Sequence, residues 1–409
     1  MMLLSRFPVL LGMLFILSCA CSSAVYAHTL ILVSLDGFRH DYLDRFDAPR
    51  LNAIAKEGFR VRRLEPVYPP NTFPAHLSLI TGLPPQDHGI VDNHFCHQTR
   101  GDCYHMGDGG KDPSWLKGVP LWNLVEAHGL RSATYFWPES DARWGGDRPS
   151  YYLPYQKRAP YDERVDQVLN WLALPEVSRP RLVTLYFSAV DSAGHYYGPD
   201  SAETKAAVAE VDRQIGRLWK GLQAMDLPDW SLMVVSDHGM SAIRSGDEIL
   251  ASELPEPEGF ERMVSYSRVR YFPKDTDSDQ RLAAASAQLG LDLDSLAAGR
   301  WQTLNTDDTI ALGGTDQATA GQYTLIARPP HFFSRKLLPA GSVQGTHGYP
   351  LDVSDMAAFA IGAGAAFKSG IVIDSAHQLD IYPVAAAVLG LRPLTPLPSD
   401  GGYLRGVLH

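Results

Sequence analysis

Five short apolar runs, most of them rich in β-branched residues, constrain the fold of this chain most strongly. They are "TLILVSL" (29–35), "SATYFW" (132–137), "RLVTLYFSA" (181–189), "SLMVVS" (231–236) and "DMAAFAIG" (355–362). Such runs are typical of strands that are buried on both faces of a sheet. Helical patterns lie between them, so we predict an α/β fold with a mostly parallel central sheet and helices on both faces.

The clearest helical pattern covers residues 204–225. One face of this helix carries Val208, Val211, Ile215, Leu218, Trp219 and Leu222. Pro199 and Asp200, with Glu203 three residues further on, mark its expected start.

The length of 409 residues allows one large α/β domain with insertions or two smaller domains. Residues 246–345 are more polar, contain many turn residues and carry short strand-like runs such as "SRVRYF" and "YTLIA". We interpret this segment as an insertion or cap region inside a single catalytic domain of residues 28–409.

The N-terminal segment "MMLLSRFPVLLGMLFILSCACSSAVYA" has one arginine, a continuous apolar run and small residues up to Ala27. This order predicts a signal peptide over residues 1–27 and an exported protein, periplasmic or secreted. An N-terminal membrane anchor and lipidation at Cys19 or Cys21 are the alternatives. We expect no membrane span in the mature chain, because no other segment is long and apolar enough.

The charge balance argues against a nucleic-acid-binding protein. Removal of residues 1–27 leaves 35 basic and 46 acidic residues, a net charge of −11. Non-specific binding to nucleic acid needs Lys and Arg to displace counterions. An anionic small-molecule substrate would therefore have to be received by something other than side-chain charge, such as a metal ion.

Two cysteines remain in the mature chain, Cys96 and Cys103 in "NHFCHQTRGDCYH". Two close cysteines in an exported chain favour one local disulfide. The alternative is a zinc site that combines these thiols with His94, His97 or His105.

Acidic and histidine side chains follow three of the strand-like runs. They are Asp36, the pair Asp191 and His195, and the pair Asp237 and His238, with His347 further along in "GTHGYP". In an open α/β sheet, sites form beyond the carboxyl ends of the strands, so these groups are expected at one edge. Each aspartate taken singly is also a good helix N-cap. Together, the carboxylates would repel one another unless a cation neutralised them, and Asp and His suit zinc, or less well manganese or iron. Six such ligands are too many for one tetrahedral zinc and suffice for two.

Thr72 lies just before Pro74 in "YPPNTFPAHLSLITG" (68–82). Pro is favoured in the first turn of a helix, which places Thr72 near a helix N-terminus, where negative charge is stabilised. The residue is either a simple N-cap or, beside two metal ions, a nucleophile whose hydroxyl has a lowered pKa.

The chain resembles the bacterial nucleotide pyrophosphatase/phosphodiesterases (type I phosphodiesterases) of the alkaline phosphatase superfamily. The resemblance rests on "SLDGFRHDYL", "YPPNTFPAHLSLITGLPPQDHGIVDNHF", "YFSAVDSAGHYYGP", "VVSDHGM" and "GTHGYP", in this order, with "LDIYPVAAAVLGL" (379–391) continuing it. It implies an alkaline-phosphatase-like fold and two zinc ions. One would be held by Asp191, His195 and His347, and the other by Asp36, Asp237, His238 and the Thr72 oxygen.

The resemblance also implies a mechanism. Thr72 attacks phosphorus, Asn93 donates a hydrogen bond to a non-bridging oxygen, and water hydrolyses the phosphothreonine with net retention at phosphorus. "TFPAH" (72–76) departs from the sulfatases, whose nucleophile matures from Cys or Ser followed by Pro and Arg. No counterpart of the arginine and third metal of the phosphomonoesterases is evident, which favours diesters.

Phe73, Tyr155 and Tyr186 match positions whose aromatic rings flank a nucleobase in nucleotide-cleaving relatives, although all three also suit an apolar core. We therefore expect a nucleotide pyrophosphatase/phosphodiesterase that releases nucleoside monophosphates. The alternatives are the same chemistry on a non-nucleotide phosphodiester, phospholipid or phosphonate, and a catalytically silent module that binds metal and partners.

Overall fold

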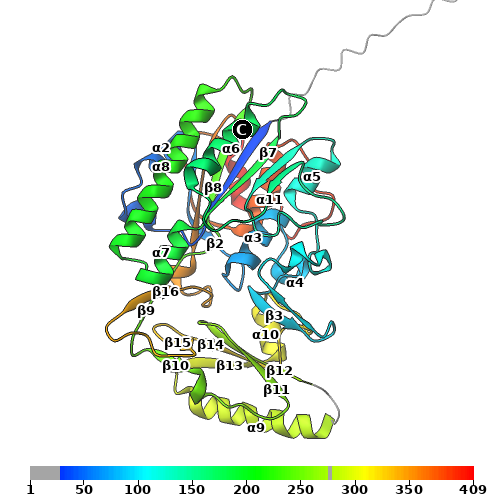
Figure 1. The fold of residues 1–409 in the computed structure, drawn as a ribbon, viewed down its shortest axis with the longest axis vertical. Helices are drawn as coiled ribbons and strands as arrows, with labels where there is room; N and C mark the ends of the chain where they lie inside the picture. Colours follow the sequence, from blue (N-terminus) through cyan, green and yellow to red (C-terminus); the bar gives the residue numbers. More distant parts are fainter. Residues whose placement is uncertain (1–27, 275–278) are drawn as a thin grey trace, which may run out of the picture.

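The computed structural model of the protein describes residues 28–274 and 279–409. The signal peptide predicted for residues 1–27 lies outside the described residues. Figure 1 shows a large layered body above a smaller lobe. Among the residues that the structure describes, no helix has the length and apolar character needed to cross a membrane.

The large body is built on an eight-stranded sheet in the order β18-β2-β17-β8-β1-β7-β5-β6. Its strands are β1 (Thr29–Leu35), β2 (Phe59–Glu65), β5 (Ser132–Tyr135), β6 (Tyr151–Leu153), β7 (Leu182–Phe187), β8 (Trp230–Val235), β17 (Ala358–Gly364) and β18 (Ile371–His377). Only β17 runs antiparallel to its neighbours, β2 and β8. The predicted α/β fold with a mostly parallel sheet is confirmed.

Helices cover both faces of this sheet (Figure 1). Side chains of β1 alternate between the two resulting cores: Leu30 and Leu32 face one, and Ile31, Val33 and Leu35 face the other. The first core includes α3 (Thr72–Thr81), α5 (Leu121–Ala127) and α11 (Ile381–Val388), and the second includes α2 (Pro49–Glu57), α6 (Tyr161–Leu172) and α8 (Ala202–Ala224). Two-sided burial explains why the strands appear in the sequence as continuous apolar runs.

The smaller lobe comes from the segment interpreted as an insertion. Its four-stranded antiparallel sheet has the order β11-β12-β14-β13 and is flanked by helices α9 and α10. These elements are β11 (Phe260–Val264), β12 (Arg268–Pro273), α9 (Asp279–Ala297), β13 (Trp301–Asn305), α10 (Thr306–Leu312) and β14 (Tyr323–Ala327). The lobe has its own apolar core, in which Val269, Leu293 and Leu325 are buried. Two small ribbons complete this region. The ribbon of β9 (Ser241–Arg244) with β16 (Val343–Thr346) lies where the lobe joins the body, and that of β10 (Glu248–Leu250) with β15 (Phe332–Ser334) lies in the lobe beside its sheet.

Cys96 and Cys103 form the predicted disulfide, across the hairpin of β3 (His94–His97) and β4 (Asp102–His105). The alternative zinc site is excluded because both sulfur atoms are used in this bond.

Several predicted boundaries were wrong by a few residues. In the run 181–189 the strand ends at Phe187, because helix α7 (Ala189–Tyr197) begins two residues later. The run 355–362 begins as a strand only at Ala358, after a short 3-10 turn. The N-cap of α8 is Ser201 rather than the Pro199-Asp200 pair, since the Ser201 Oγ accepts a hydrogen bond from the Thr204 backbone N–H.

Helix α2 has no side-chain cap of its own, and Asp212 of helix α8 supplies one. The Asp212 Oδ1 accepts hydrogen bonds from the backbone N–H groups of Arg50 (2.9 Å) and Leu51 (2.8 Å). This fully buried carboxylate therefore holds two helices together on one face of the sheet.

We predict that Asp212→Ala lowers the free energy of unfolding by about 2 kcal/mol, because two helix-end donors lose their acceptor in a buried place. Urea denaturation would measure the change. Glu203→Ala, which removes an exposed carboxylate from the same helix, is the matched control and should have an effect within about 0.5 kcal/mol. Equal effects of the two substitutions would contradict this role of Asp212.

Candidate active site

The site begins where three adjacent central strands end. In the sheet, β1 lies between β8 and β7, with Ser34 level with Val235 and Leu35 level with Phe187. Asp36 follows β1 directly, Asp237 follows β8 after Ser236, and Asp191 lies in the first turn of helix α7, after β7. Parallel strands thus bring the three aspartates to one edge, as the sequence predicted.

Each of these carboxylates has one buried oxygen atom that lacks a hydrogen-bond partner: Asp36 Oδ1, Asp191 Oδ1 and Asp237 Oδ2. The second oxygens of Asp36 and Asp237 are used, since Asp36 Oδ2 accepts from the Tyr186 hydroxyl and Asp237 Oδ1 from the Gly37 N–H (3.1 Å). Buried acceptors of this kind are rare without a ligand. The unpartnered oxygens are the atoms that a cation would bind.

The three histidines all present Nε2 to this cluster, because Nδ1 lies against an oxygen acceptor in each. Nδ1 of His195 lies 2.9 Å from the Gly345 carbonyl, and Nδ1 of His238 lies 2.8 Å from the Gly239 carbonyl. For His347, Nδ1 lies 3.0 Å from the Pro70 carbonyl and 2.9 Å from Asn71 Oδ1. Such contacts fix the tautomer and ring orientation of histidines that bind metals.

Distances between the candidate ligand atoms fit tetrahedral zinc. Bonds of about 2.0 Å to a tetrahedral ion separate neighbouring ligands by roughly 3.3 Å. The His238 Nε2 lies 3.1 Å from Asp237 Oδ2 and 3.5 Å from Asp36 Oδ1. Around the other aspartate, Asp191 Oδ1 lies 3.2 Å from His195 Nε2 and 3.8 Å from His347 Nε2. Both sets of residues are therefore compatible with a bound metal ion such as zinc.

Two groups of ligand atoms lie within 4.8 Å of one another: Asp36, Asp237 and His238, and Asp191, His238 and His347. His238 belongs to both groups, whereas the resemblance assigned it to one ion only. His195 approaches Asp191 from the next turn of the same helix and lies outside the second group. The stretch from Asp191 to His195 is therefore part of helix α7.

The ionisable groups of this cluster have pKa values that are shifted in different directions. Burial and the charges of Asp237 and Asp191 raise the pKa of Asp36 well above its ordinary value. Burial also opposes ionisation of Asp191, but the neighbouring His195 outweighs it and holds the pKa of Asp191 at about 2. Burial lowers the pKa of His347 to about 3, so this imidazole is neutral at neutral pH, as a metal ligand must be.

Thr72 is the first residue of α3, and its Oγ1 lies 3.4 Å from His238 Nε2. It faces the same cluster as the aspartates. Asn93 lies beside it, and its Oδ1 accepts a hydrogen bond from the Phe73 N–H (2.9 Å). The Asn93 amide nitrogen is therefore oriented away from the helix and can donate to a ligand.

A cavity of about 530 Å³ opens from this cluster and is lined by Phe73, Tyr155, Tyr186 and Phe136, with Thr72 and Asn93 at its base. Tyr155 is half exposed, and its ring lies 6.2 Å from that of Tyr186 in an edge-on arrangement. The structure brings the three predicted aromatic residues to one cavity. We refer to it as the aromatic cavity.

Sequence reasoning missed two residues that support this arrangement, Arg164 and Asp92, and a second role of Tyr186. Tyr186 does more than line the cavity, because its hydroxyl donates to Asp36. Arg164 is buried, donates to the Tyr186 carbonyl (2.7 Å) and lies over the Phe136 ring at 4.9 Å. Asp92 accepts from Asn71 (2.7 Å) and from the Asn93 N–H (2.8 Å). Asp92 and Tyr186 lie within the matched motifs, whereas Arg164 lies outside them and carries no signal in the sequence.

The rim of the aromatic cavity contains strained backbone. Phe136 and Glu139 both have positive φ, at 67° and 60°, which costs of order 1–3 kcal/mol for each residue other than glycine. Glu139 is also buried, accepts a hydrogen bond from the Tyr104 hydroxyl and has one oxygen without a partner. Burial raises its pKa to about 7.

This raised pKa predicts a pH-dependent stability. The Glu139 carboxyl group binds its proton more tightly in the folded protein than in the unfolded chain. Its contribution to the free energy of unfolding is therefore fully present below about pH 4.5 and is lost as the pH rises to about 7. Glu139→Gln removes this titration. The free energy of unfolding of the variant, relative to wild type, should therefore rise by about 3 kcal/mol between pH 4 and pH 8. Denaturation at both pH values measures it, and a difference that is independent of pH would contradict the prediction.

Comparisons with known proteins agree with this geometry. The family described as type I phosphodiesterase / nucleotide pyrophosphatase matches residues 30–350. A venom phosphodiesterase of Macrovipera lebetinus is 31% identical over 395 residues, which cover 94% of this chain and 45% of the relative. Ectonucleotide pyrophosphatase/phosphodiesterase family member 1 of Homo sapiens is 31% identical over 424 residues, covering 94% of this chain and 42% of the relative.

The chain spans about half the length of the curated relatives that it matches. Among solved structures, murine ectonucleotide pyrophosphatase/phosphodiesterase 5 is similar with a TM-score of 0.83 and 24% identity, covering 93% of this chain and all of that chain. An inactive variant of the same murine protein, in complex with AMP, is similar with the same TM-score. The fold is therefore shared with that enzyme family, and the chain belongs to the type I phosphodiesterase / nucleotide pyrophosphatase family.

Proposed function

We propose that this chain is a zinc-dependent hydrolase that cleaves nucleotide phosphodiesters and phosphoanhydrides and releases nucleoside monophosphates. The observation that carries the proposal is the position of the Thr72 hydroxyl, at a helix N-terminus and 3.4 Å from His238 in a cluster of unpartnered carboxylate oxygens. We take residues 28–409 as one catalytic domain and residues 246–345 as its cap.

Asp36, Asp237, His238 and Thr72 would hold one zinc ion, and Asp191, His195 and His347 the other. Bound there, the two ions would lower the pKa of a hydroxyl or a water molecule and neutralise charge on the phosphoryl and leaving oxygens. This use of metal charge suits a chain whose overall charge is negative.

The residues of the chain account for the remaining steps. The Thr72 hydroxyl loses its proton to solvent and its oxygen attacks phosphorus. The new O–P bond forms as the bond to the leaving oxygen breaks, with the electron pair departing on that oxygen. Asn93 is oriented by the Phe73 N–H, so that its amide nitrogen donates to a non-bridging oxygen as charge develops there. Water then attacks the phosphothreonine, which releases the monophosphate and returns a proton to Thr72.

The aromatic cavity would bind the nucleoside. Phe73 follows the nucleophile directly, and Tyr155 offers a half-exposed ring near Tyr186. Stacking of a base on such rings stabilises binding by roughly 1–3 kcal/mol and tolerates any base. The AMP complex of the similar murine protein supports a nucleotide ligand for this fold.

An exported location is part of the proposal. Disulfides such as Cys96–Cys103 persist in oxidising compartments, and they are rare in proteins of reducing compartments. Two of the relatives described above are a venom enzyme and an ectonucleotide enzyme.

The catalytic role of Thr72 is tested with the nitrophenyl ester of thymidine monophosphate, compared with nitrophenyl phosphate. We expect the diester to be the better substrate and Thr72→Ala to lower kcat by at least ~10³-fold, because the variant lacks the oxygen that the proposal assigns to the phosphoenzyme. Thr81→Val, which removes a hydroxyl from the far end of the same helix, should retain activity. Preference for the monoester would reject the substrate class, and an active Thr72→Ala variant would reject the nucleophile.

Metal content is the second test. Elemental analysis should find two zinc ions per chain, and one after either Asp237→Asn or Asp191→Asn. Removal of the metal with a chelator should lower the thermal midpoint, because each site that is filled at 1,000 times its Kd stabilises the fold by about 4 kcal/mol. His128→Gln, an exposed histidine outside the cluster, is the control and should keep both ions. A single ion in the wild-type protein would contradict the two-metal proposal.

A further inference from the structure

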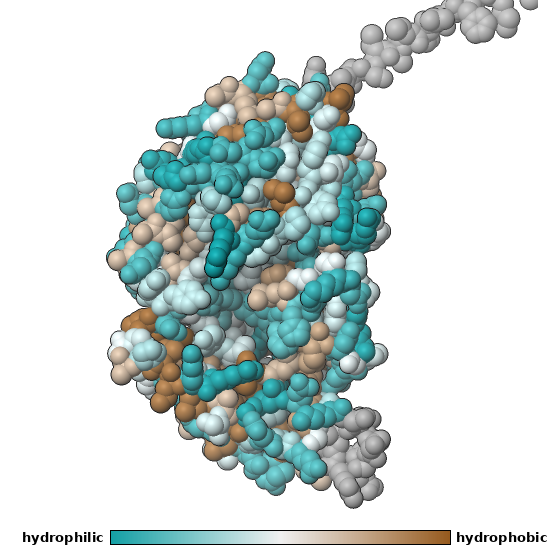
Figure 2. Space-filling view, in the orientation of Figure 1, coloured by the Kyte–Doolittle hydropathy of each residue, from teal (hydrophilic) through white to brown (hydrophobic). Residues whose placement is uncertain are grey.

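A second cavity, of about 220 Å³, lies between the main body and the lobe. Figure 2 shows the surface hollowed between these two parts. The second cavity shares Asn93, His195 and His347 with the aromatic cavity, so the two meet at the candidate metal site. Thr72 lines only the aromatic cavity.

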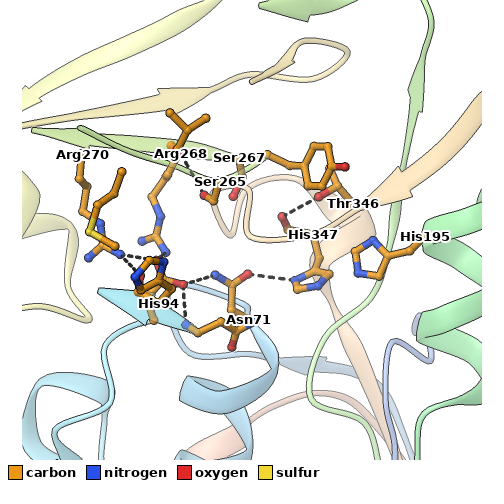
Figure 3. Close-up of a pocket in the computed structure, with 14 residues that line it drawn as sticks. Asn71, His94, His195, Ser265, Ser267, Arg268, Arg270, Thr346 and His347 are labelled. Atoms are coloured by element: carbon orange, nitrogen blue, oxygen red, sulfur yellow. Dashed lines mark hydrogen bonds and ion pairs between the residues drawn. The ribbon is translucent and has the colours of Figure 1, made fainter. Parts of the chain in front are cut away.

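The second cavity has a surplus of positive charge. Arg268 and Arg270 of strand β12 both line it, and both are almost fully buried. They share one counterion, since each donates to Asp92 Oδ2 (Arg268 at 2.6 Å and Arg270 at 2.5 Å). The other Asp92 oxygen is occupied by Asn71 and the Asn93 N–H. Figure 3 shows both guanidinium groups on one side of this cavity and His347 and His195 on the other.

Two guanidinium groups with one carboxylate leave one positive charge uncompensated in a buried place, which is costly unless an anion pairs with it. Arg268 Nε is buried and has no partner, and among the described residues only Asp92 forms an ion pair with either arginine. The remaining lining groups include the hydroxyls of Ser265, Tyr266 and Thr346. This combination of hydroxyls and arginine forks suits phosphate oxygens.

We propose that the second cavity is a leaving-group subsite that binds the anionic part of a phosphoanhydride substrate, such as pyrophosphate, through Arg268 and Arg270. This inference rests on the proposed function, because it places the scissile phosphorus where the two cavities meet. In-line displacement sends the leaving group away from Thr72, and the second cavity is the one that Thr72 does not line.

The chemistry makes this charge useful during the reaction. As the Thr72 oxygen bonds to the α-phosphorus, the bond from phosphorus to the bridging oxygen breaks, and its electron pair stays on the departing pyrophosphate. The leaving group thereby gains negative charge on the side of the lobe. An alcohol leaving group would gain far less from the two arginines, so the subsite would favour anhydrides over esters.

The test compares two substrates that share the thymidine monophosphoryl group: thymidine 5′-triphosphate and the nitrophenyl ester of thymidine monophosphate. Arg268→Gln should lower the ratio of kcat/KM for the triphosphate to that for the ester by roughly 10-fold or more, the effect of losing one charged hydrogen bond. Arg268→Lys keeps the charge and loses the fork, so the ratio should fall less. If Arg268→Gln does not fold, the lysine variant carries the test.

Arg262→Gln is the matched control, since Arg262 lies on the neighbouring strand β11 and pairs with Glu256 outside this cavity. Its ratio should equal that of wild type. A binding measurement without turnover uses calorimetry in the Thr72→Ala background, where Arg268→Gln should weaken the triphosphate more than thymidine monophosphate.

The outcomes separate the two proposals. If wild type cleaves both substrates and Arg268→Gln lowers both equally, the arginine only positions Asp92 and the subsite is rejected. The subsite is also rejected if Arg268→Gln changes neither the ratio of kcat/KM for the triphosphate to that for the ester nor the affinity for the triphosphate relative to thymidine monophosphate. If wild type cleaves neither substrate, the proposed function fails first.

Discussion

Everything at this site depends on bringing three carboxylates into one buried place. Asp36, Asp191 and Asp237 would repel one another there, and each retains an oxygen without a hydrogen-bond partner. A cation is the partner that resolves both problems. The surrounding contacts serve the same end, because the histidines turn Nε2 toward the carboxylates and the Tyr186 hydroxyl occupies the second oxygen of Asp36.

Asp92 connects the lobe to this cluster. One of its oxygens binds the two lobe arginines, and the other binds Asn71 and the Asn93 backbone. Asn71 in turn contacts His347, so three buried hydrogen bonds in series connect each lobe arginine to a candidate metal ligand. In our proposal, the inserted segment is therefore part of the site, and its charge helps to select the substrate.

Five of the eight strands of the large sheet, and the acidic and histidine residues that follow three of them, were predictable, because two-sided burial and strand-end position leave a pattern in the sequence. Thr72 at the start of α3 follows from Pro74 in the same way. The boundaries of elements were less predictable. The apolar run 181–189 contains β7 and reaches the first residue of helix α7, and no residue in it indicates where the strand ends and the helix begins. Arg164, Asp92 and the second role of Tyr186 left no local pattern, since each acts through a partner distant in sequence.

The sequence by itself determined the fold class, through the periodicity of its apolar runs, and the family, through its motifs. It also favoured the Cys96–Cys103 disulfide over a zinc site and named the candidate metal ligands, because these depend on short spacings and on the ends of strands. Only the tertiary structure decided how the candidate ligands are grouped, with His238 between two aspartate groups, and where the lobe places Arg268 and Arg270. The two arginines meet Asp92 across 176 and 178 positions of sequence, and the grouping around His238 joins residues from separate segments, so no pattern within one segment encodes either feature.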